Sequence, residues 1–132
     1  MIGVLILAQD AMGSGLVAAA THILGTPPLR VEVLAVDDAC TPPETLTAEL
    51  DETLARLDDG GGVLILADIY GASHTNTACR VAQGRRVELV AGVSLPMLIR
   101  VLNHRDLTLT ELVGKATSGG TEGIVCSRDR PK

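Results

Sequence analysis

Three segments of the chain place small and polar residues directly after apolar runs that have the length of buried strands. They are residues 9–15 (QDAMGSG), 68–74 (DIYGASH) and 91–97 (AGVSLPM). Loops that follow parallel strands meet at one edge of a sheet, where ligands bind in open α/β folds. Each segment also leads into a predicted helix, and the free amides of a helix N-terminus favour an anion such as phosphate. The loops therefore predict one anion-binding crevice around Gln9, Asp68 and Ser94.

Asp68 ends an otherwise apolar run, and two interpretations of it remain open. Aspartate is a favoured N-cap residue, so its carboxylate is suited to accept a hydrogen bond from the first turn of the next helix. In a functional site the same carboxylate would instead orient a partner side chain. Ser73 has the same ambiguity between helix capping and contact with a phosphate group.

Residues 13–18 (GSGLVA) match the G-x-G-x-x-A form of the dinucleotide-binding fingerprint, and Asp37 follows at about the spacing that the fingerprint requires. However, four residues separate the end of the apolar run from Gly13, whereas the first glycine of the fingerprint belongs to the tight turn itself. The chain is also short for two mononucleotide-binding halves. We therefore expect no nucleotide and no other cofactor.

The histidines and cysteines do not predict a metal centre or a disulfide framework. His22 falls on a predicted helix, and His74 and His104 fall in a loop or at a helix end, none with the spacing of metal ligands. The chain has three cysteines and no Cys-x-x-Cys pair. Free thiols fit a reducing compartment, so we expect a cytoplasmic protein.

The composition argues against two kinds of partner. The net charge is −5, and Tyr70 is the only aromatic residue. Without a basic stripe, or aromatic rings on which bases stack, nucleic-acid binding is not expected. The apolar residues 1–8 are too few to span a bilayer, so no membrane insertion is expected. The acidic excess falls within residues 44–59 and is interpreted as a solvated helix face.

Apolar runs and helix signals alternate along the chain. Strands are predicted at residues 2–8, 31–36, 63–67 and 87–90, with a short last strand at 123–126. Helices are predicted at residues 13–24, from Pro42 to the glycines at 60–62, and at 72–82, 95–102 and 107–116. Thr41 is expected to cap the second helix, and Thr108 with Glu111 the last one. The pattern predicts one doubly wound α/β domain over residues 1–127, with a parallel sheet covered by helices on both faces, and a polar tail at 128–132.

Taken together, these motifs resemble the enzyme IIA domain of the mannose/fructose type in the bacterial sugar phosphotransferase system. The matching segments are residues 2–15, 62–76 (GVLILADIYGASHTN) and 90–102 (VAGVSLPMLIRVL). The resemblance covers nearly the whole chain. It implies four parallel strands plus a short C-terminal antiparallel strand, which is often exchanged between the subunits of a homodimer. It also implies a histidine phosphocarrier protein and a IIB component as partners.

The resemblance also implies which residues form the site. The family carries a phosphoryl group on a histidine just after the first strand, in a Thr-His-Gly type of loop, and an aspartate after the third strand holds that histidine. The aspartate aligns with Asp68, and the nearby serine of the family aligns with Ser73. The remaining loop residues expected to contact phosphate or a partner are Asp10, Met12, Gly13, Gly71, Ala72, Ser94, Pro96 and Met97.

The sequence departs from the family pattern at the phosphorylated position. Ala8 and Gln9 stand where the family has its Thr-His pair, so Gln9 occupies the position of the phosphohistidine. A primary amide is not a nucleophile at neutral pH, and we therefore predict that the chain is inactive in phosphoryl transfer. Ser94 stands where the family usually has asparagine. An acyl phosphate on Asp10 or Asp68 would need an acidic Mg²⁺-binding cluster, which the sequence does not offer.

Two functional interpretations follow. In the first, the chain is a IIA component of a phosphoenolpyruvate-dependent sugar phosphotransferase system with a degenerate phosphorylation site at Gln9. In the alternative, it is a non-enzymatic regulatory protein that keeps the IIA fold and partner surface, and the Gln9 amide imitates a neutral imidazole by donating and accepting hydrogen bonds. Neither interpretation identifies the sugar or the IIB partner.

Overall fold

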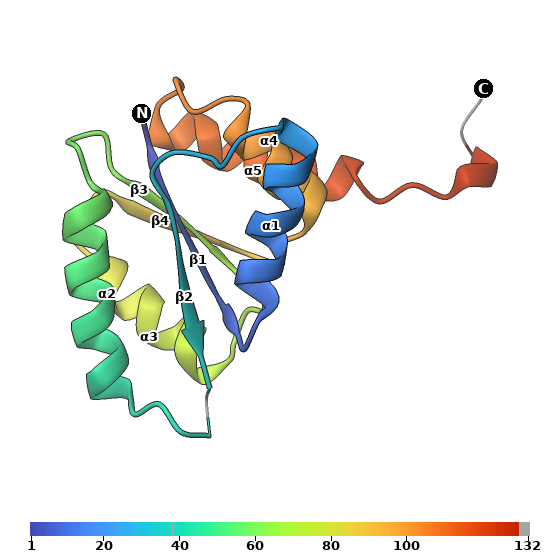
Figure 1. Cartoon of the computed structure of the whole chain (residues 1–132). Coiled ribbons are helices and arrows are strands. Elements are labelled where there is room, and N and C mark those ends of the chain that lie inside the picture. The colour runs from blue at the N-terminus through green and yellow to red at the C-terminus, as the bar shows by residue number, and fades with distance from the viewer. Residues whose placement is uncertain (38, 130–132) are drawn as a thin grey trace.

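A four-stranded parallel sheet lies at the centre of the computed structural model, which describes residues 1–37 and 39–129. Its strands are β1 (Gly3–Gln9), β2 (Val31–Val36), β3 (Val63–Ala67) and β4 (Val87–Ala91), in the order β2-β1-β3-β4 (Figure 1). Leu7 lies opposite Ala67, and Ala67 lies opposite Ala91. The carboxyl ends of β1, β3 and β4 are therefore level with one another.

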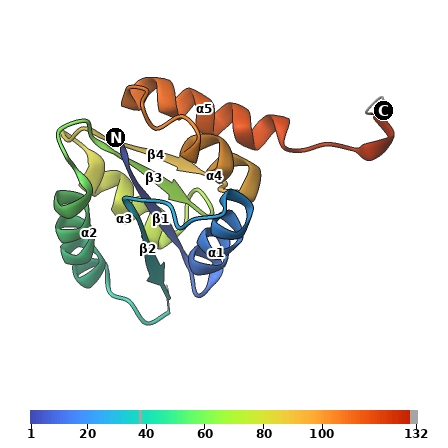
Figure 2. The same cartoon turned by 45° about the horizontal axis from the view of Figure 1, so that its top comes forward.

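Five helices cover the two faces of the sheet. They are α1 (Met12–Leu24), α2 (Pro43–Leu57), α3 (Ser73–Ala82), α4 (Leu95–Leu102) and α5 (Leu109–Glu122). Figures 1 and 2 show α2 and α3 on one face, and α1, α4 and α5 on the other. The predicted doubly wound α/β architecture is confirmed. The division into a domain at 1–127 and a tail at 128–132 stays a prediction, and residues 130–132 lie outside the described residues.

The two central strands, β1 and β3, are apolar up to Gln9 at the end of β1, because both of their faces are covered. Successive side chains of a strand point to opposite faces. Val4 and Ile6 accordingly pack with α1, α4 and α5 in one cluster, while Leu5 and Leu7 pack with α2 and α3 in a second cluster. Full burial of such a side chain contributes about 1.5–3 kcal/mol relative to exposure, so these two layers hold the strand ends in place.

The helix ends agree with the sequence signals in part. Thr108 and Glu111 form the predicted capping box at the start of α5, and Gly25 ends α1 in the left-handed conformation. The predicted Thr41 cap is wrong, because α2 begins at Pro43 after Pro42 and has no side-chain cap. Thr41 belongs to the preceding turn, where its amide nitrogen donates to the Asp37 carbonyl at 2.7 Å.

The last helix, α5, is longer than predicted and runs through Gly119 and Gly120 to Glu122. A Cβ atom at Gly119 would lie 2.9 Å from the Arg100 Cβ, and one at Gly120 would lie 2.9 Å from the Met97 Cε. The glycines therefore allow α5 to lie close against α4. This tertiary packing outweighs the low helix propensity of glycine.

The short last strand predicted at residues 123–126 is absent from the described part of this single chain. After α5 the chain runs away from the body of the molecule toward a single 3-10 turn at Ser127–Asp129 (Figures 1 and 2). Ile124 is 84% exposed and Val125 is 50% exposed. An extended segment forms a strand only when it pairs with another strand, and residues 123–126 do not lie beside the sheet of their own chain.

Arg105 ties together the amino ends of the strands, a role that the sequence did not indicate. Its side chain is buried, with Nε donating to the Ile2 carbonyl at 3.0 Å and Nη2 donating to the carbonyls of Ile2 at 2.6 Å and Arg30 at 2.9 Å. Nη1 donates to the Leu29 carbonyl. Burial, together with the nearby Arg30, lowers the pKa of Arg105 from its ordinary value.

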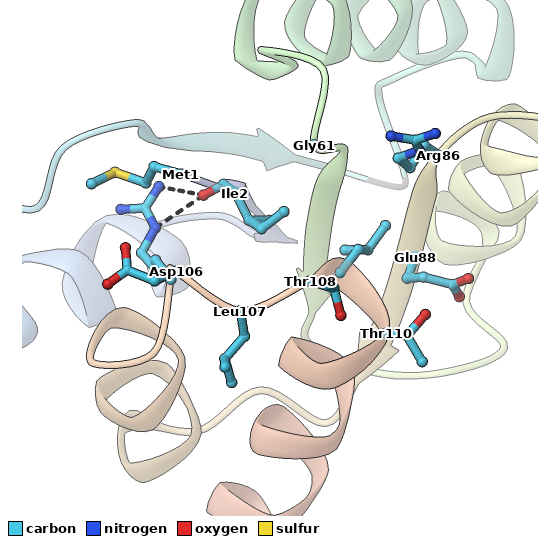
Figure 3. A pocket seen from close by; sticks show the side chains of 11 residues that line it. Met1, Ile2, Gly61, Arg86, Glu88, Asp106, Leu107, Thr108 and Thr110 are labelled. Atoms are coloured by element: carbon cyan, nitrogen blue, oxygen red, sulfur yellow. Dashed lines mark hydrogen bonds between the residues drawn. The ribbon is translucent and has the colours of Figure 1, made fainter.

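A cavity of about 480 Å³ opens beside Arg105 at this edge of the sheet. Figure 3 shows Ile2, Gly61 and Arg86 around it, and each of these residues precedes a strand. The cavity therefore lies at the amino edge, opposite the predicted site.

We expect Arg105→Met to lower the free energy of unfolding by at least about 2 kcal/mol, because buried carbonyls lose charged donors. Urea unfolding followed by circular dichroism measures this. The matched control is Arg128→Met, which removes an exposed guanidinium and is expected to change stability by less than about 0.5 kcal/mol. Equal effects of the two substitutions would contradict the proposed role of Arg105.

Candidate functional site

Gln9 and Asp68 meet at the carboxyl edge of the sheet. Gln9 is the last residue of β1, and Asp68 directly follows β3. The Asp68 amide donates to the Leu7 carbonyl at 3.2 Å, which continues the pairing of the two strands. The backbone nitrogen of Gln9 donates to Asp68 Oδ2 at 2.9 Å. The structure therefore places the backbone of position 9 beside the Asp68 carboxylate, and the role that the resemblance implies for its side chain stays a prediction.

The Asp68 carboxylate accepts two further hydrogen bonds, both at its other oxygen. The Ile69 amide nitrogen lies 2.8 Å from Oδ1, and the Nε2 atom of His74 lies 2.7 Å from the same oxygen. Asp68 is not the N-cap of α3, because Ala72 holds that position without a side-chain cap. Of the two interpretations that the sequence left open, the helix cap is therefore wrong. The functional interpretation stays a prediction, and the structure shows a hydrogen bond between Asp68 and the His74 side chain.

His74 is the site residue that sequence reasoning missed. The sequence suggested a loop or helix-end histidine, whereas its side chain is 0% exposed in the first turn of α3. Gly71 has a φ of +89°, a left-handed conformation that favours glycine, and it turns the chain so that His74 faces back toward Asp68. A histidine six residues after a strand-ending aspartate, with a glycine between them, was the available signal.

Further hydrogen bonds hold the loop between Asp68 and His74 in shape. The Thr75 hydroxyl donates to the Ile69 carbonyl at 2.5 Å. The Asn76 side chain donates to the Gly71 carbonyl at 3.4 Å, and the backbone nitrogen of Asn76 donates to the Ala72 carbonyl at 2.9 Å. The loop therefore fixes the distance between the aspartate and the histidine.

Opposing effects set the charge of Asp68. Burial raises the pKa of its carboxyl, but the hydrogen bonds from His74 and from the amides of Gln9 and Ile69 lower it by more, so the pKa of Asp68 lies below its ordinary value. Donors to a carboxylate stabilise its charged form. Asp68 is therefore an ionised carboxylate at neutral pH.

The loop after β1 presents exposed side chains above a tightly packed glycine. Asp10 and Met12 are exposed, and Asp10 has a φ of +49°. A Cβ atom at Gly13 would lie 2.7 Å from the Val33 Cγ1 and 3.2 Å from the Ile6 Cγ2. Gly13 therefore lets α1 start directly against β1 and β2, which is a packing role.

The loop after β4 lies beside the end of β3. The Val93 amide donates to the Ala67 carbonyl at 2.9 Å. Ser94 is the N-cap of α4, and its hydroxyl accepts a hydrogen bond from the Met97 amide at 3.3 Å. Met97 is buried in the core, whereas Pro96 is exposed. Of these predicted site residues, Ser94 therefore caps a helix and Met97 packs in the core.

The rim of the site next to Asp68 is exposed. Ser73 is exposed at the first position of α3, after the exposed Gly71 and the half-buried Ala72. Ile69 is 58% exposed and Tyr70 is 76% exposed. The predicted contacts of these residues with phosphate or a partner remain predictions.

The described residues contain neither a metal-binding cluster nor a helix suited to cross a bilayer. Within residues 1–37 and 39–129, no three His, Cys, Asp or Glu side chains gather as ligands of a metal ion would. No helix in the same ranges has both the length and the apolar character that a bilayer crossing requires.

Asp68→Asn is expected to lower the free energy of unfolding by about 1–3 kcal/mol at pH 7, because an amide cannot accept hydrogen bonds at both of its ends. The pKa of Asp68 is depressed in the folded protein, so this stabilisation is present above the unfolded value of about 4 and is lost as the pH falls through the lower folded value. Urea unfolding at pH 7 and at pH 3 tests the expectation that the difference between the two proteins shrinks in acid.

The matched control is Asp106→Asn at an exposed carboxylate, for which we expect a small effect at both pH values. A difference between the Asp68→Asn variant and the unmodified chain that stays constant with pH would contradict the charge assigned to Asp68.

Comparison with known proteins places the chain in a family. Residues 3–116 match the family model described as the PTS system fructose IIA component. The mannose-specific EIIAB component of Escherichia coli K12 is 38% identical over 91 residues, which cover 67% of this chain and 28% of that protein. The fructose-specific EIIA component of Bacillus subtilis is 32% identical over 92 residues, which cover 67% of this chain and 63% of that protein. The chain thus matches less than two thirds of the length of either relative.

Solved structures share the fold. The phosphotransferase system component EIIA from Streptococcus agalactiae superposes with a TM-score of 0.87 at 21% identity, covering 98% of this chain and 100% of that one. A mannose/sorbose-specific IIA subunit from Enterococcus faecalis superposes with a TM-score of 0.82 at 21% identity, covering 99% and 97%. Since the family model covers most of the chain, the protein belongs to the fructose IIA component family of the phosphotransferase system, as the loop motifs predicted.

Proposed function

We propose that this chain serves a sugar phosphotransferase system of the mannose/fructose type and that it carries no phosphoryl group at position 9. The observation that carries the proposal is the glutamine at the end of β1, whose backbone nitrogen lies 2.9 Å from Asp68 Oδ2. The surroundings of the position are those of a phosphohistidine site by family resemblance, but the side chain is a primary amide. An amide has no basic lone pair with which to attack phosphorus.

The partners in this proposal follow from the family and from the surface near the site. A histidine phosphocarrier protein and a IIB component are the expected partners, and the Escherichia coli relative is itself named an EIIAB component. The exposed apolar side chains at this edge are Met12 (42%), Ile69 (58%) and Tyr70 (76%). Exposed apolar patches beside a site favour protein contacts. We place the chain in the cytoplasm, where a phosphocarrier would meet it.

The extended C-terminal segment supports a homodimer. β4 is an edge strand of the sheet, so one side of its backbone lacks a neighbouring strand within the described chain. A cavity of about 330 Å³ lies between β4 and α5, and Ile124 is among the residues that line it. We propose that residues 123–126 of each subunit pair with the sheet of the other, which would bury Ile124 and Val125.

Given phosphoenolpyruvate, enzyme I and the histidine phosphocarrier protein, the unmodified chain is expected to take up no labelled phosphate. Gln9→His is expected to take up acid-labile phosphate, because an imidazole beside the Asp68 carboxylate regains a nucleophilic nitrogen. The matched control is Gln83→His, which adds a histidine at an exposed position at the end of α3 and should remain unlabelled.

Labelling of the unmodified chain would refute the degenerate-site proposal. If Gln9→His folds and stays unlabelled, the result would instead favour the regulatory alternative, in which neighbouring positions have also lost phosphoryl transfer.

Light scattering over a dilution series is expected to show a dimer at micromolar concentration. Ile124→Asp should weaken the dimer at least about tenfold, because a charge replaces a side chain buried in the proposed interface, and about 1.4 kcal/mol corresponds to tenfold. Ile23→Asp at an exposed position of α1 is the control and should leave the dimer intact. A folded monomer of the unmodified chain at micromolar concentration would count against this arrangement.

A further inference from the structure

We propose that His74 is a positioning residue that holds the Asp68 carboxylate in a fixed orientation, with one oxygen turned toward position 9. What the oriented carboxylate serves rests on the proposed function. The hydrogen bonds that orient it do not involve the side chain of position 9. Nothing in the family resemblance assigns a role to this histidine.

The two carboxylate oxygens receive donors from different parts of the chain. Oδ1 faces its own loop and α3, where it lies 2.8 Å from the Ile69 amide nitrogen and 2.7 Å from the His74 Nε2. Oδ2 faces the end of β1 and lies 2.9 Å from the Gln9 amide nitrogen. Rotation of the carboxylate would break all three hydrogen bonds. Of these three donors, His74 contributes a side chain, whereas Gln9 and Ile69 contribute backbone nitrogens, so substitution of His74 tests the orientation.

The direction of the His74 hydrogen bond follows from the charge of its partner. An ionised carboxylate only accepts hydrogen bonds, so the Nε2 atom must carry a proton. The side chains of His74 and Asp68 are 0% and 8% exposed, so water competes little for either group. A buried hydrogen bond to a charged group is among the stronger ones in proteins.

Burial also distinguishes positioning from phosphate acceptance at His74 itself. A phosphoryl group that arrives on another protein needs an exposed nitrogen, and the His74 ring lies wholly beneath the surface in the first turn of α3. A buried imidazole is costly unless its polar atoms have partners. The Asp68 carboxylate is one such partner, and it is the same group that the site needs in a defined orientation.

The first test is spectroscopic and uses the unmodified chain. Long-range ¹H–¹⁵N spectra of the three histidines at neutral pH are expected to show a proton on the Nε2 of His74. His104 serves as an internal reference, because its Nδ1 lies 2.8 Å from the Arg100 carbonyl and must be the donor there. An Nε2 atom of His74 without a proton would overturn the proposal. Substitution by Asp68→Asn should shift the His74 ring signals and leave those of His104 in place.

The second test measures phosphate uptake in the Gln9→His background. Adding His74→Leu removes the donor at similar volume, and we expect the uptake rate to fall about 100-fold, because a displaced catalytic group costs about that much. Adding His74→Gln keeps an N–H donor and should restore the rate to within about tenfold of Gln9→His. His22→Leu, at an exposed position near the far end of α1, is the control and should change nothing.

These outcomes separate the two proposals. A loss smaller than about threefold with His74→Leu, or equal losses with His74→Leu and His74→Gln, would overturn the positioning role. If Gln9→His takes up no phosphate, the proposed function of the site fails, while the ring spectra of the unmodified chain still decide the role of His74. If the His74→Leu protein does not fold, the ring spectra of the unmodified chain likewise decide the role of His74.

Discussion

The arrangement of the loops at the carboxyl edge depends on one interaction, the acceptance of three hydrogen bonds by the Asp68 carboxylate. The donors are the end of β1, the loop after β3 and the first turn of α3, contributed by Gln9, Ile69 and His74. Burial alone would favour the neutral acid, and the donors reverse that preference. Because the charge and the donors depend on each other, a change at any one of them alters the remaining loops.

The bond between Asp68 and position 9 explains how the fold tolerates a glutamine there. The donor is the backbone amide of Gln9, which every residue except proline supplies. The hydrogen bond between position 9 and Asp68 therefore does not require a particular side chain at position 9. The sheet supports the same conclusion, since β1 and β3 are held by buried apolar residues on both faces.

Most of the framework could be predicted from local patterns, and the buried polar contacts could not. The apolar runs at β1 and β3, the box at Thr108 and the end of α1 at Gly25 are each encoded within a few residues. Arg105 finds its partners through the tertiary fold, with Arg105 and Ile2 separated by 103 residues. His74 and Asp68 are only six residues apart, but the direction of the His74 side chain depends on the conformation of the loop between them. The segment at 123–126 has the composition of a strand, but within residues 1–37 and 39–129 of this single chain no strand lies beside it.

Hydrogen-bond donors to Asp68 also explain how the chain keeps the aspartate of the family site although position 9 is not a histidine. A buried carboxylate without a nearby positive or donating group would be neutral or would destabilise the fold. A histidine at position 9 would be one such donor, yet this chain already has another in His74 on the opposite oxygen. Asp68 can therefore remain ionised when position 9 is glutamine. Retention of the aspartate is thus explained by the stability of the loops as well as by phosphoryl transfer, so its presence alone does not indicate that the chain carries phosphate.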